Sequence, residues 1–128
     1  MGAERGLDAL KDASTAHAEL DTRYAAIRQQ SLRLCEPLEI EDFCVQPMED
    51  ASPPKWHLAH TTWFFETFLL KQRLPRYEPF HPEYETLFNS YYNGVGRPFP
   101  RARRGYLSRP TVEQVRAFAA GGSARIQR

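Results

Sequence analysis

Two histidines lie three residues apart in an aromatic stretch near the middle of the chain. His57 and His60 belong to the segment WHLAHTTWFF. In a helix, residues three apart lie on neighbouring faces, so the two imidazoles could ligate one metal ion. The sequence contains no HExxH motif and no second cluster of histidine and cysteine. Spacing alone therefore favours a packed or surface pair, and the metal site is kept as a hypothesis.

A loop rich in arginine and free of acidic residues is the second candidate site. Its sequence is GRPFPRARRGYLSRP, in which Arg101, Arg103 and Arg104 follow two prolines that restrain the backbone. The planar fork of a guanidinium suits recognition of a carboxylate. Composition alone favours a solvated basic loop, so an anion site at these arginines is likewise a hypothesis.

Composition bounds the class of protein. The chain has 128 residues, which fits one domain, and its net charge of +1 gives no reason to expect a nucleic-acid or membrane partner. The longest apolar stretch, WFFETFLL, is interrupted by Glu66 and is shorter than the roughly 20 residues that span a bilayer. Cys35 and Cys44 have no CxxC partner, and the N-terminus does not resemble a signal peptide. We expect a cytoplasmic protein with two free thiols.

Hydrophobic periodicity predicts the helices that must position these side chains. The first helix is expected over 14–35, because Pro37 cannot continue a helix, and residues 1–13 are expected to form a flexible extension. Its apolar stripe repeats at spacings of four and three and consists of Leu20, Tyr24, Ile27, Ser31 and Leu34. Such a stripe is typical of an amphipathic helix.

The second helix is expected over 54–72 and carries both histidines. Asp50 and Ser52 are predicted cap donors, and Pro54 suits the first helical turn. The apolar stripe of this helix is broad and includes Trp56, Ala59, His60, Trp63, Phe64, Thr67, Phe68 and Leu70. A stripe of this width predicts the central helix of a bundle, covered on more than one side.

A third helix is expected over 111–120. Thr111 and Gln114 form a capping-box pattern at its start. The pair Gly121-Gly122 is expected to end it, because glycine is a poor helix former.

The segment between the second and third helices is rich in proline and glycine. It is expected to be an irregular crossover with one short helix over 82–93, capped by Gly94. No segment alternates apolar and polar residues as a strand does. The sequence therefore predicts an all-α helical bundle with one long crossover rich in Pro and Arg.

Four segments of the chain resemble the N-terminal, DinB-like part of the hercynine oxygenases, enzymes of ergothioneine biosynthesis. The longest segment contains both candidate histidines, and the four lie at residues 50–68, 77–82, 87–93 and 104–110. The resemblance extends from about Leu20 to Phe118. It implies a partial DinB-like helical domain over residues 14–120.

The resemblance also implies a chemistry and a role for three residues. Hercynine oxygenases use non-haem iron(II) and O₂ to join hercynine to γ-glutamylcysteine, forming a C–S bond and a sulfoxide. Of the histidines that hold the iron, one matches His60 and the others belong to an HxxxH element on a later helix. The paired arginines that bind the carboxylates of γ-glutamylcysteine resemble Arg101 and Arg104. The implied cofactor is iron(II), and the implied partners are the two small-molecule substrates.

The chain departs from the family pattern near its C-terminal end. Residues 119–123 replace the expected continuation of the third helix, and the sequence lacks the HxxxH element and the large C-terminal domain with the catalytic tyrosine. We therefore expect a truncated DinB-like bundle and a tail over 121–128 that is unrelated to the family. We also expect that this chain alone binds iron weakly and has no activity.

Two alternative functions stay open. A non-catalytic helical module could bind a partner through an exposed aromatic face. A stand-alone DinB-type metal-dependent enzyme could act without a C-terminal domain, but it needs three metal ligands, which the sequence does not offer convincingly. The enzymatic role is thus assigned to the family and stays open for this chain.

Overall fold

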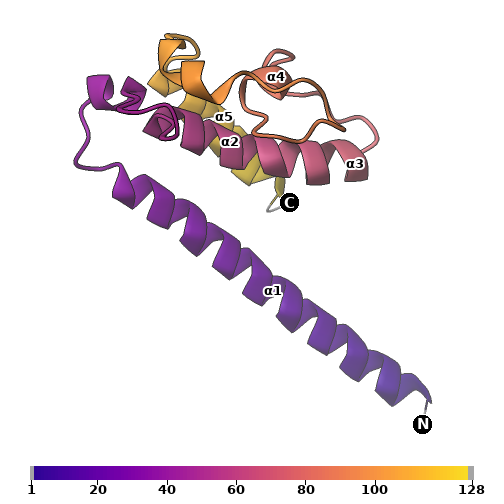
Figure 1. Cartoon of the computed structure of the whole chain (residues 1–128). Helices are drawn as coiled ribbons and strands as arrows, with labels where there is room; N and C mark the ends of the chain where they lie inside the picture. Colours follow the sequence, from indigo (N-terminus) through magenta and orange to yellow (C-terminus); the bar gives the residue numbers. More distant parts are fainter. Residues whose placement is uncertain (1, 127–128) are drawn as a thin grey trace. The chain divides into compact units, whose positions relative to one another are not determined.

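The computed structural model describes residues 2–126, which form helices joined by turns and one long crossover (Figure 1). These residues contain no β-strand, only an isolated bridge between Met48 and Ala51. The predicted all-α class is therefore confirmed. The chain divides into two compact units, residues 1–36 and 37–128, which are described separately.

The first unit is one helix, α1 (Gly2–Leu34). The helix begins at Gly2, well before residue 14, so the predicted start is wrong. Residues 2–13 contain no proline, and eight of the twelve are Ala, Leu, Glu, Arg or Lys, which favour a helix. The Thr15 hydroxyl, close to the predicted start, donates to the Lys11 carbonyl at 3.0 Å instead of capping a new helix.

The second unit is built around a helix that matches the predicted range 54–72. It consists of α2 (Pro54–Phe65), a π-helical turn η2 (Glu66–Leu70) and the short α3 (Lys71–Arg73), which follow one another without a break. The predicted caps are wrong, because Pro53 is the N-cap residue and no side chain caps α2. The side chains of Asp50 and Ser52 therefore do not begin this helix.

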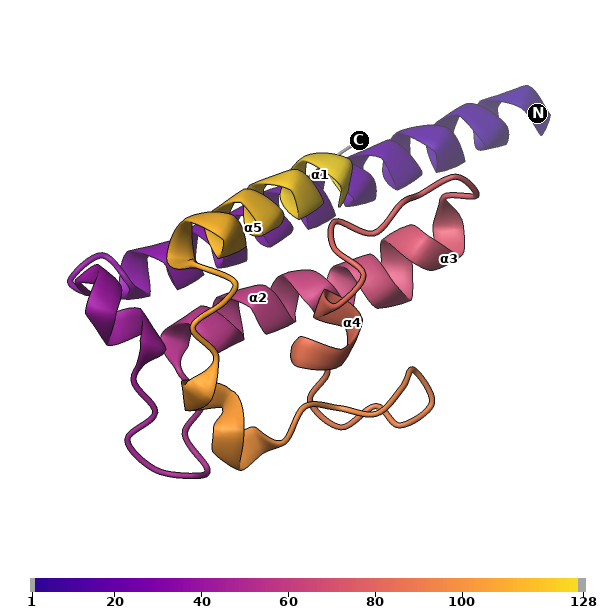
Figure 2. The same ribbon diagram turned by 90° about the horizontal axis from the view of Figure 1, so that it is seen from above.

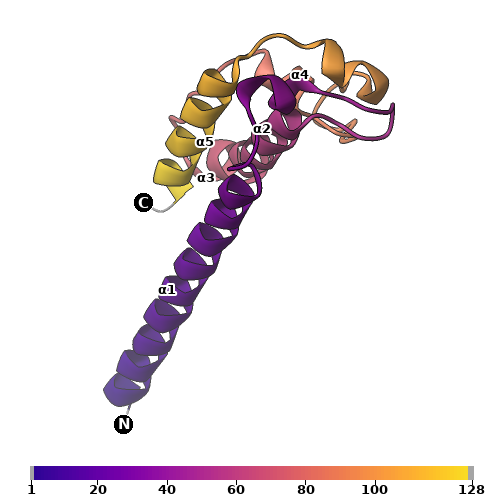
Figure 3. The ribbon, with the colours of Figure 1, turned by 90° about the vertical axis from the view of Figure 1, so that its left-hand side faces the viewer.

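The last helix, α5 (Val112–Ile126), runs alongside α2 and in the same direction (Figures 2 and 3). The predicted capping box is confirmed: the Thr111 backbone N–H donates to Gln114 Oε1 at 2.8 Å, and the Gln114 backbone N–H donates to Thr111 Oγ1 at 3.1 Å. Together α2, η2, α5, the crossover and the segment before α2 bury an apolar core made of Phe43, Trp56, Leu58, Ala59, Trp63, Leu70, Tyr84, Phe88, Val112, Val115 and Phe118.

The predicted end of this helix at the glycine pair is wrong, because α5 continues through both glycines to Ile126. Gly122 is buried, and a Cβ atom placed on it would lie 2.8 Å from Thr62 Cγ2 of α2. The missing side chain thus lets the two helices approach closely, and this contact offsets the low helix propensity of glycine.

The crossover contains less helix than predicted. It holds one turn of helix, α4 (Tyr84–Leu87), and a 3₁₀ segment, η3 (Arg101–Tyr106); another 3₁₀ segment, η1 (Ile40–Cys44), precedes α2. The expected helix over 82–93 ends after Leu87 because the Asn89 side chain bonds the following loop. Its Oδ1 accepts from the Tyr92 backbone N–H at 2.9 Å, and its Nδ2 donates to the Tyr92 carbonyl at 3.0 Å.

Buried polar side chains fasten the crossover to the central helix. Glu66 of η2 accepts hydrogen bonds from the Tyr77 hydroxyl at 2.6 Å and from the Phe80 backbone N–H at 3.2 Å. Trp56 Nε1 of α2 donates to the Leu87 carbonyl at 2.8 Å. The crossover is therefore irregular but ordered, since backbone groups at Phe80 and Leu87 are paired with side chains of the helix. Across residues 2–126, no helix combines the length and apolarity that a bilayer-spanning segment needs.

Changing the two glycines of α5 separately tests the close approach of α2 and α5. Gly122→Leu should lower the free energy of unfolding by about 1–3 kcal/mol, because the new side chain overpacks against Thr62. Gly121→Ala should raise it by up to about 1 kcal/mol, since a Cβ there meets only Phe80, at 3.9 Å. Urea unfolding followed by circular dichroism measures both changes.

The combination of Gly122→Ala with Thr62→Ser serves as the control. Serine removes the methyl group that faces Gly122 but keeps a hydroxyl that can donate to the Leu58 carbonyl, as Thr62 does at 3.2 Å. The paired variant should be more stable than Gly122→Ala alone after correction for Thr62→Ser. Equal effects of side chains at positions 121 and 122 would contradict the packing account.

Candidate functional site

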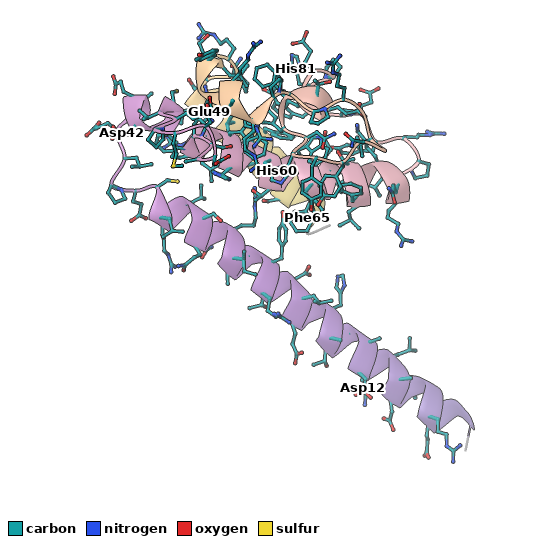
Figure 4. All side chains as sticks on the ribbon, in the orientation of Figure 1. Asp12, Asp42, Glu49, His60, Phe65 and His81 are labelled. Atoms are coloured by element: carbon teal, nitrogen blue, oxygen red, sulfur yellow. The ribbon has the colours of Figure 1, made fainter. Side chains whose placement is uncertain are left out.

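His60 lies half-buried on α2 (Figure 4). Two indoles and a backbone carbonyl hold its ring. The imidazole stacks on Trp56, with ring centroids 4.7 Å apart and planes inclined by 9°. It also stacks on Trp63 at 5.6 Å. His60 Nδ1 lies 2.7 Å from the Phe88 carbonyl oxygen of the crossover. The ring orientation is therefore fixed by three neighbours.

The hydrogen bond to Phe88 determines the tautomer of His60. A carbonyl oxygen can only accept a hydrogen bond, so Nδ1 must carry the proton. In the neutral ring, Nε2 then keeps its lone pair and can act as a base or a metal ligand. Burial lowers the pKa of His60, the Phe88 carbonyl raises it and the positive charge of Arg104 lowers it; the net shift is downward. His60 is thus held in the neutral form at pH 7.

The carbonyl that orients His60 belongs to a loop organised by a fully buried asparagine. Asn89 has no exposed surface, and its amide bonds the Tyr92 backbone and, at 3.3 Å, the Gly96 carbonyl. Since Asn89 directly follows Phe88, these bonds fix the backbone at the point where the Phe88 carbonyl faces the imidazole. An outer partner of this kind, bonded to the nitrogen that does not ligate, is usual for metal-binding histidines.

Arg104 of η3 is buried beside the indole of Trp56. Its guanidinium carbon lies 3.5 Å from the centroid of the Trp56 ring. Its Nη1 donates to Ser52 Oγ at 2.9 Å, and its Nη2 donates to the Ser90 carbonyl at 3.5 Å. Burial and the nearby charge of Arg101 lower the pKa of Arg104 to about 10, so it remains a cation at neutral pH.

Two polar atoms at this position lack a hydrogen-bond partner within the described part of the chain. They are Arg104 Nε and Ser90 Oγ, and both are buried. A buried donor without a partner costs free energy, and buried polar atoms in folded proteins are nearly always satisfied. The pair therefore identifies the surroundings of Arg104 as a place where a polar ligand group could bind.

Trp56 brings the two candidate sites of the sequence together. His60 is one helical turn further along α2, and Arg104 comes from the far end of the crossover; both stack on the Trp56 ring. The positive charge of Arg104 lowers the pKa of His60. An imidazole lone pair and a buried cation thus share one aromatic platform.

The other candidates of the sequence lie further from this platform. The centroids of the His57 and Trp56 rings lie 5.5 Å apart in an edge-to-face arrangement, and the His57 side chain is exposed. Partial loss of water around the ring lowers the pKa of His57, and so do the nearby His60 and Arg104. Arg101 is exposed at the start of η3, and Arg103 is exposed in the middle of it. Arg101 is close enough to Arg104 for its charge to lower the pKa of Arg104.

Some residues of the site were missed by sequence reasoning. Trp56 is buried, as its place in the apolar stripe predicts, but its stacking on His60 is not predicted. Its place four residues before His60 is a signal that the two rings can stack in a helix. Ser52 was read as a cap, but its hydroxyl accepts from Arg104. The Phe88 and Ser90 carbonyls act through the position of the backbone, so the identities of these two residues do not predict their roles.

His60 meets the requirements for one metal ligand: a neutral imidazole, a lone pair on Nε2 and an outer hydrogen-bond partner. Within residues 2–126, no three side chains of His, Cys, Asp or Glu are arranged to hold a metal ion together. The further histidine ligands that the resemblance implies have no counterpart among these residues. The donor set of the described chain therefore fits one position of the implied iron site.

The comparisons with known proteins bear on this arrangement. A family model of the DinB superfamily matches residues 23–128, which is most of the chain. The comparison with curated proteins found no match. The extent of the family match, together with the all-α architecture, shows that the chain belongs to the DinB superfamily.

Proposed function

We propose that this chain is the N-terminal, DinB-like part of a hercynine oxygenase, in which His60 is an iron(II) ligand and Arg101 and Arg104 bind the carboxylates of γ-glutamylcysteine. One observation carries the proposal above all others. The Phe88 carbonyl holds the proton of His60 on Nδ1, which leaves Nε2 as the only ring nitrogen with a lone pair. Residue types in the segment around His60 resemble that family.

The surroundings of His60 favour metal ligation over proton transfer. Stacking between Trp56 and Trp63 restricts rotation of the ring, and the lowered pKa keeps a proton from competing with the metal for Nε2. Iron(II), when bound, supplies the activation of O₂. A ring with a fixed direction loses little conformational entropy on ligation, which favours binding at this one position.

The arginine pair fits a ligand with two carboxylates. Arg104 has a desolvated guanidinium with one unpartnered Nε–H among the described residues, and Arg101 presents an exposed guanidinium nearby. Two like charges close to each other repel, and an anion placed between them relieves that repulsion. γ-Glutamylcysteine carries two carboxylates, so it could use both guanidiniums, and its thiol would extend from this anchor.

A non-catalytic binding module is the second candidate function. It is favoured by two exposed aromatic side chains. Tyr106, the last residue of η3, is 82% exposed, and Tyr91, which follows Ser90 in the crossover, is 67% exposed. Such a module would bind a partner without using the lone pair of His60. Dependence of ligand or metal binding on His60 therefore separates the two candidates.

Anaerobic titration with iron(II), followed by NMR, tests the ligand assignment. The paramagnetic ion should broaden the ring signals of His60 selectively, and only at iron concentrations well above that of the protein, because one imidazole competes weakly with water. His60→Ala should abolish the selective broadening. The matched variant His57→Ala removes a histidine one turn away and should leave the broadening of His60 unchanged. Broadening centred on His17 or His81, or equal loss in both variants, would contradict the assignment.

Titration with γ-glutamylcysteine, followed by calorimetry, tests the arginine pair. Arg101→Ala should weaken binding about tenfold or more, because a hydrogen bond between charged groups contributes about 1.5–3 kcal/mol. Arg103→Ala is the matched control, since it removes the same charge from the same 3₁₀ segment at an exposed position. Equal weakening by the two variants would reveal unspecific attraction and would refute a carboxylate site at Arg101 and Arg104.

A further inference from the structure

The 3₁₀ segment η3 (Arg101–Tyr106), here called the arginine turn, is closed by the side chain of a residue that lies far away in the sequence. Gln46 Nε2 donates to the Arg101 carbonyl at 2.8 Å, and Gln46 Oε1 accepts from the Gly105 backbone N–H at 2.6 Å. One planar amide thus bridges the first and the fifth residues of η3. A second hydrogen bond of Nε2, to the Glu49 carbonyl at 3.2 Å, ties the amide to its own loop.

Steric contact reinforces the bridge at Gly105. A Cβ atom placed on Gly105 would lie 2.6 Å from Gln46 Cβ and 3.0 Å from its Oε1. Only a residue without a side chain lets the backbone of the turn approach Gln46 this closely. The position of η3 is therefore set by Gln46 through both hydrogen bonding and packing.

Two further side chains hold the same turn, one from just before α2 and one from the first turn of α2. The Ser52 hydroxyl accepts from Arg104 Nη1. The buried ammonium of Lys55 donates to the Leu107 carbonyl at 2.9 Å and to the Ser108 carbonyl at 3.4 Å, where the chain leaves η3. Among these anchors, Gln46 bonds the backbone of both Arg101 and Gly105. These two residues stand on either side of Arg104 in the sequence.

We propose that Gln46 is a positioning residue for the anion site: by bridging Arg101 and Gly105 it sets the relative placement of the Arg101 and Arg104 guanidiniums, and so the affinity for a dicarboxylate ligand. The inference rests on the proposed function, because it takes γ-glutamylcysteine as the ligand of these arginines. Gln46 itself does not touch the ligand and acts through the turn.

Gln46→Met provides the direct test, since methionine has a similar length and no charge but makes none of the three hydrogen bonds of the Gln46 amide. Binding of γ-glutamylcysteine, measured by calorimetry on the full chain, should weaken about tenfold, the loss expected for about one net hydrogen bond. Gln72→Met makes the same change at an exposed position on α3 and should leave the affinity unchanged. Hydrogen exchange of the Gly105 amide should become faster in Gln46→Met only.

A double-mutant cycle separates positioning from general stabilisation. If Gln46 acts through the arginines, Gln46→Met should change the affinity less than about twofold once Arg101→Ala has removed the guanidinium. An undiminished tenfold effect in the Arg101→Ala background would overturn the inference. A normal affinity of Gln46→Met despite faster exchange at Gly105 would overturn it too, while Arg101→Ala still weakened binding and the proposed function stood.

A second variant tests the same bridge from the other side. Gly105→Ala should push against Gln46 and weaken binding as Gln46→Met does, whereas Gly96→Ala meets nothing within 4 Å and should have no effect. Equal affinities of the two alanine variants would count against the bridge. Absence of γ-glutamylcysteine binding by the unaltered chain would instead refute the proposed function, and the inference with it.

Discussion

The stacking of His60 and Arg104 on the Trp56 indole is the interaction on which the candidate site depends. Trp56 is buried, and its Nε1 is bonded to the Leu87 carbonyl, so the indole cannot turn without breaking its link to the crossover. His60 reaches the ring because it lies one turn along the same helix. Arg104 reaches it only because the crossover returns to α2. The Trp56 ring thus brings His60, its neighbour on the helix, and Arg104, which is distant in the sequence, into one site.

Polar side chains then determine where the crossover can lie. Asn89 closes the loop that carries the Phe88 carbonyl, and Gln46 bridges the arginine turn. Lys55 donates to the Leu107 carbonyl, directly after that turn. Each bonds backbone groups that a segment without regular secondary structure would otherwise leave unpaired. The irregular segment is therefore as specifically placed as a helix would be. Its precision comes from side-chain hydrogen bonds in place of a repeating backbone pattern.

The parts of this structure that sequence reasoning predicted are those governed by local periodicity. The broad stripe of residues 54–72 indicated a central helix, and Thr111 with Gln114 indicated a capping box, because both patterns depend on neighbours within one or two turns. The predicted end of α5 at Gly121-Gly122 is wrong because Gly122 packs closely against Thr62, which lies on another helix. Ser52 was misread as a cap for the same reason, since its partner Arg104 is distant in sequence.

The tautomer of His60 at neutral pH tests the central claim most directly. Long-range proton–nitrogen correlation spectra of the imidazoles assign the proton to Nδ1 or Nε2. His60 should carry it on Nδ1, because that nitrogen faces the Phe88 carbonyl. His81 (also labelled in Figure 4) is the internal control with the opposite tautomer, since its Nδ1 accepts from the Glu83 backbone N–H. A His60 ring that is protonated on Nε2, or on both nitrogens, would contradict the account, because no lone pair would then be available to a metal.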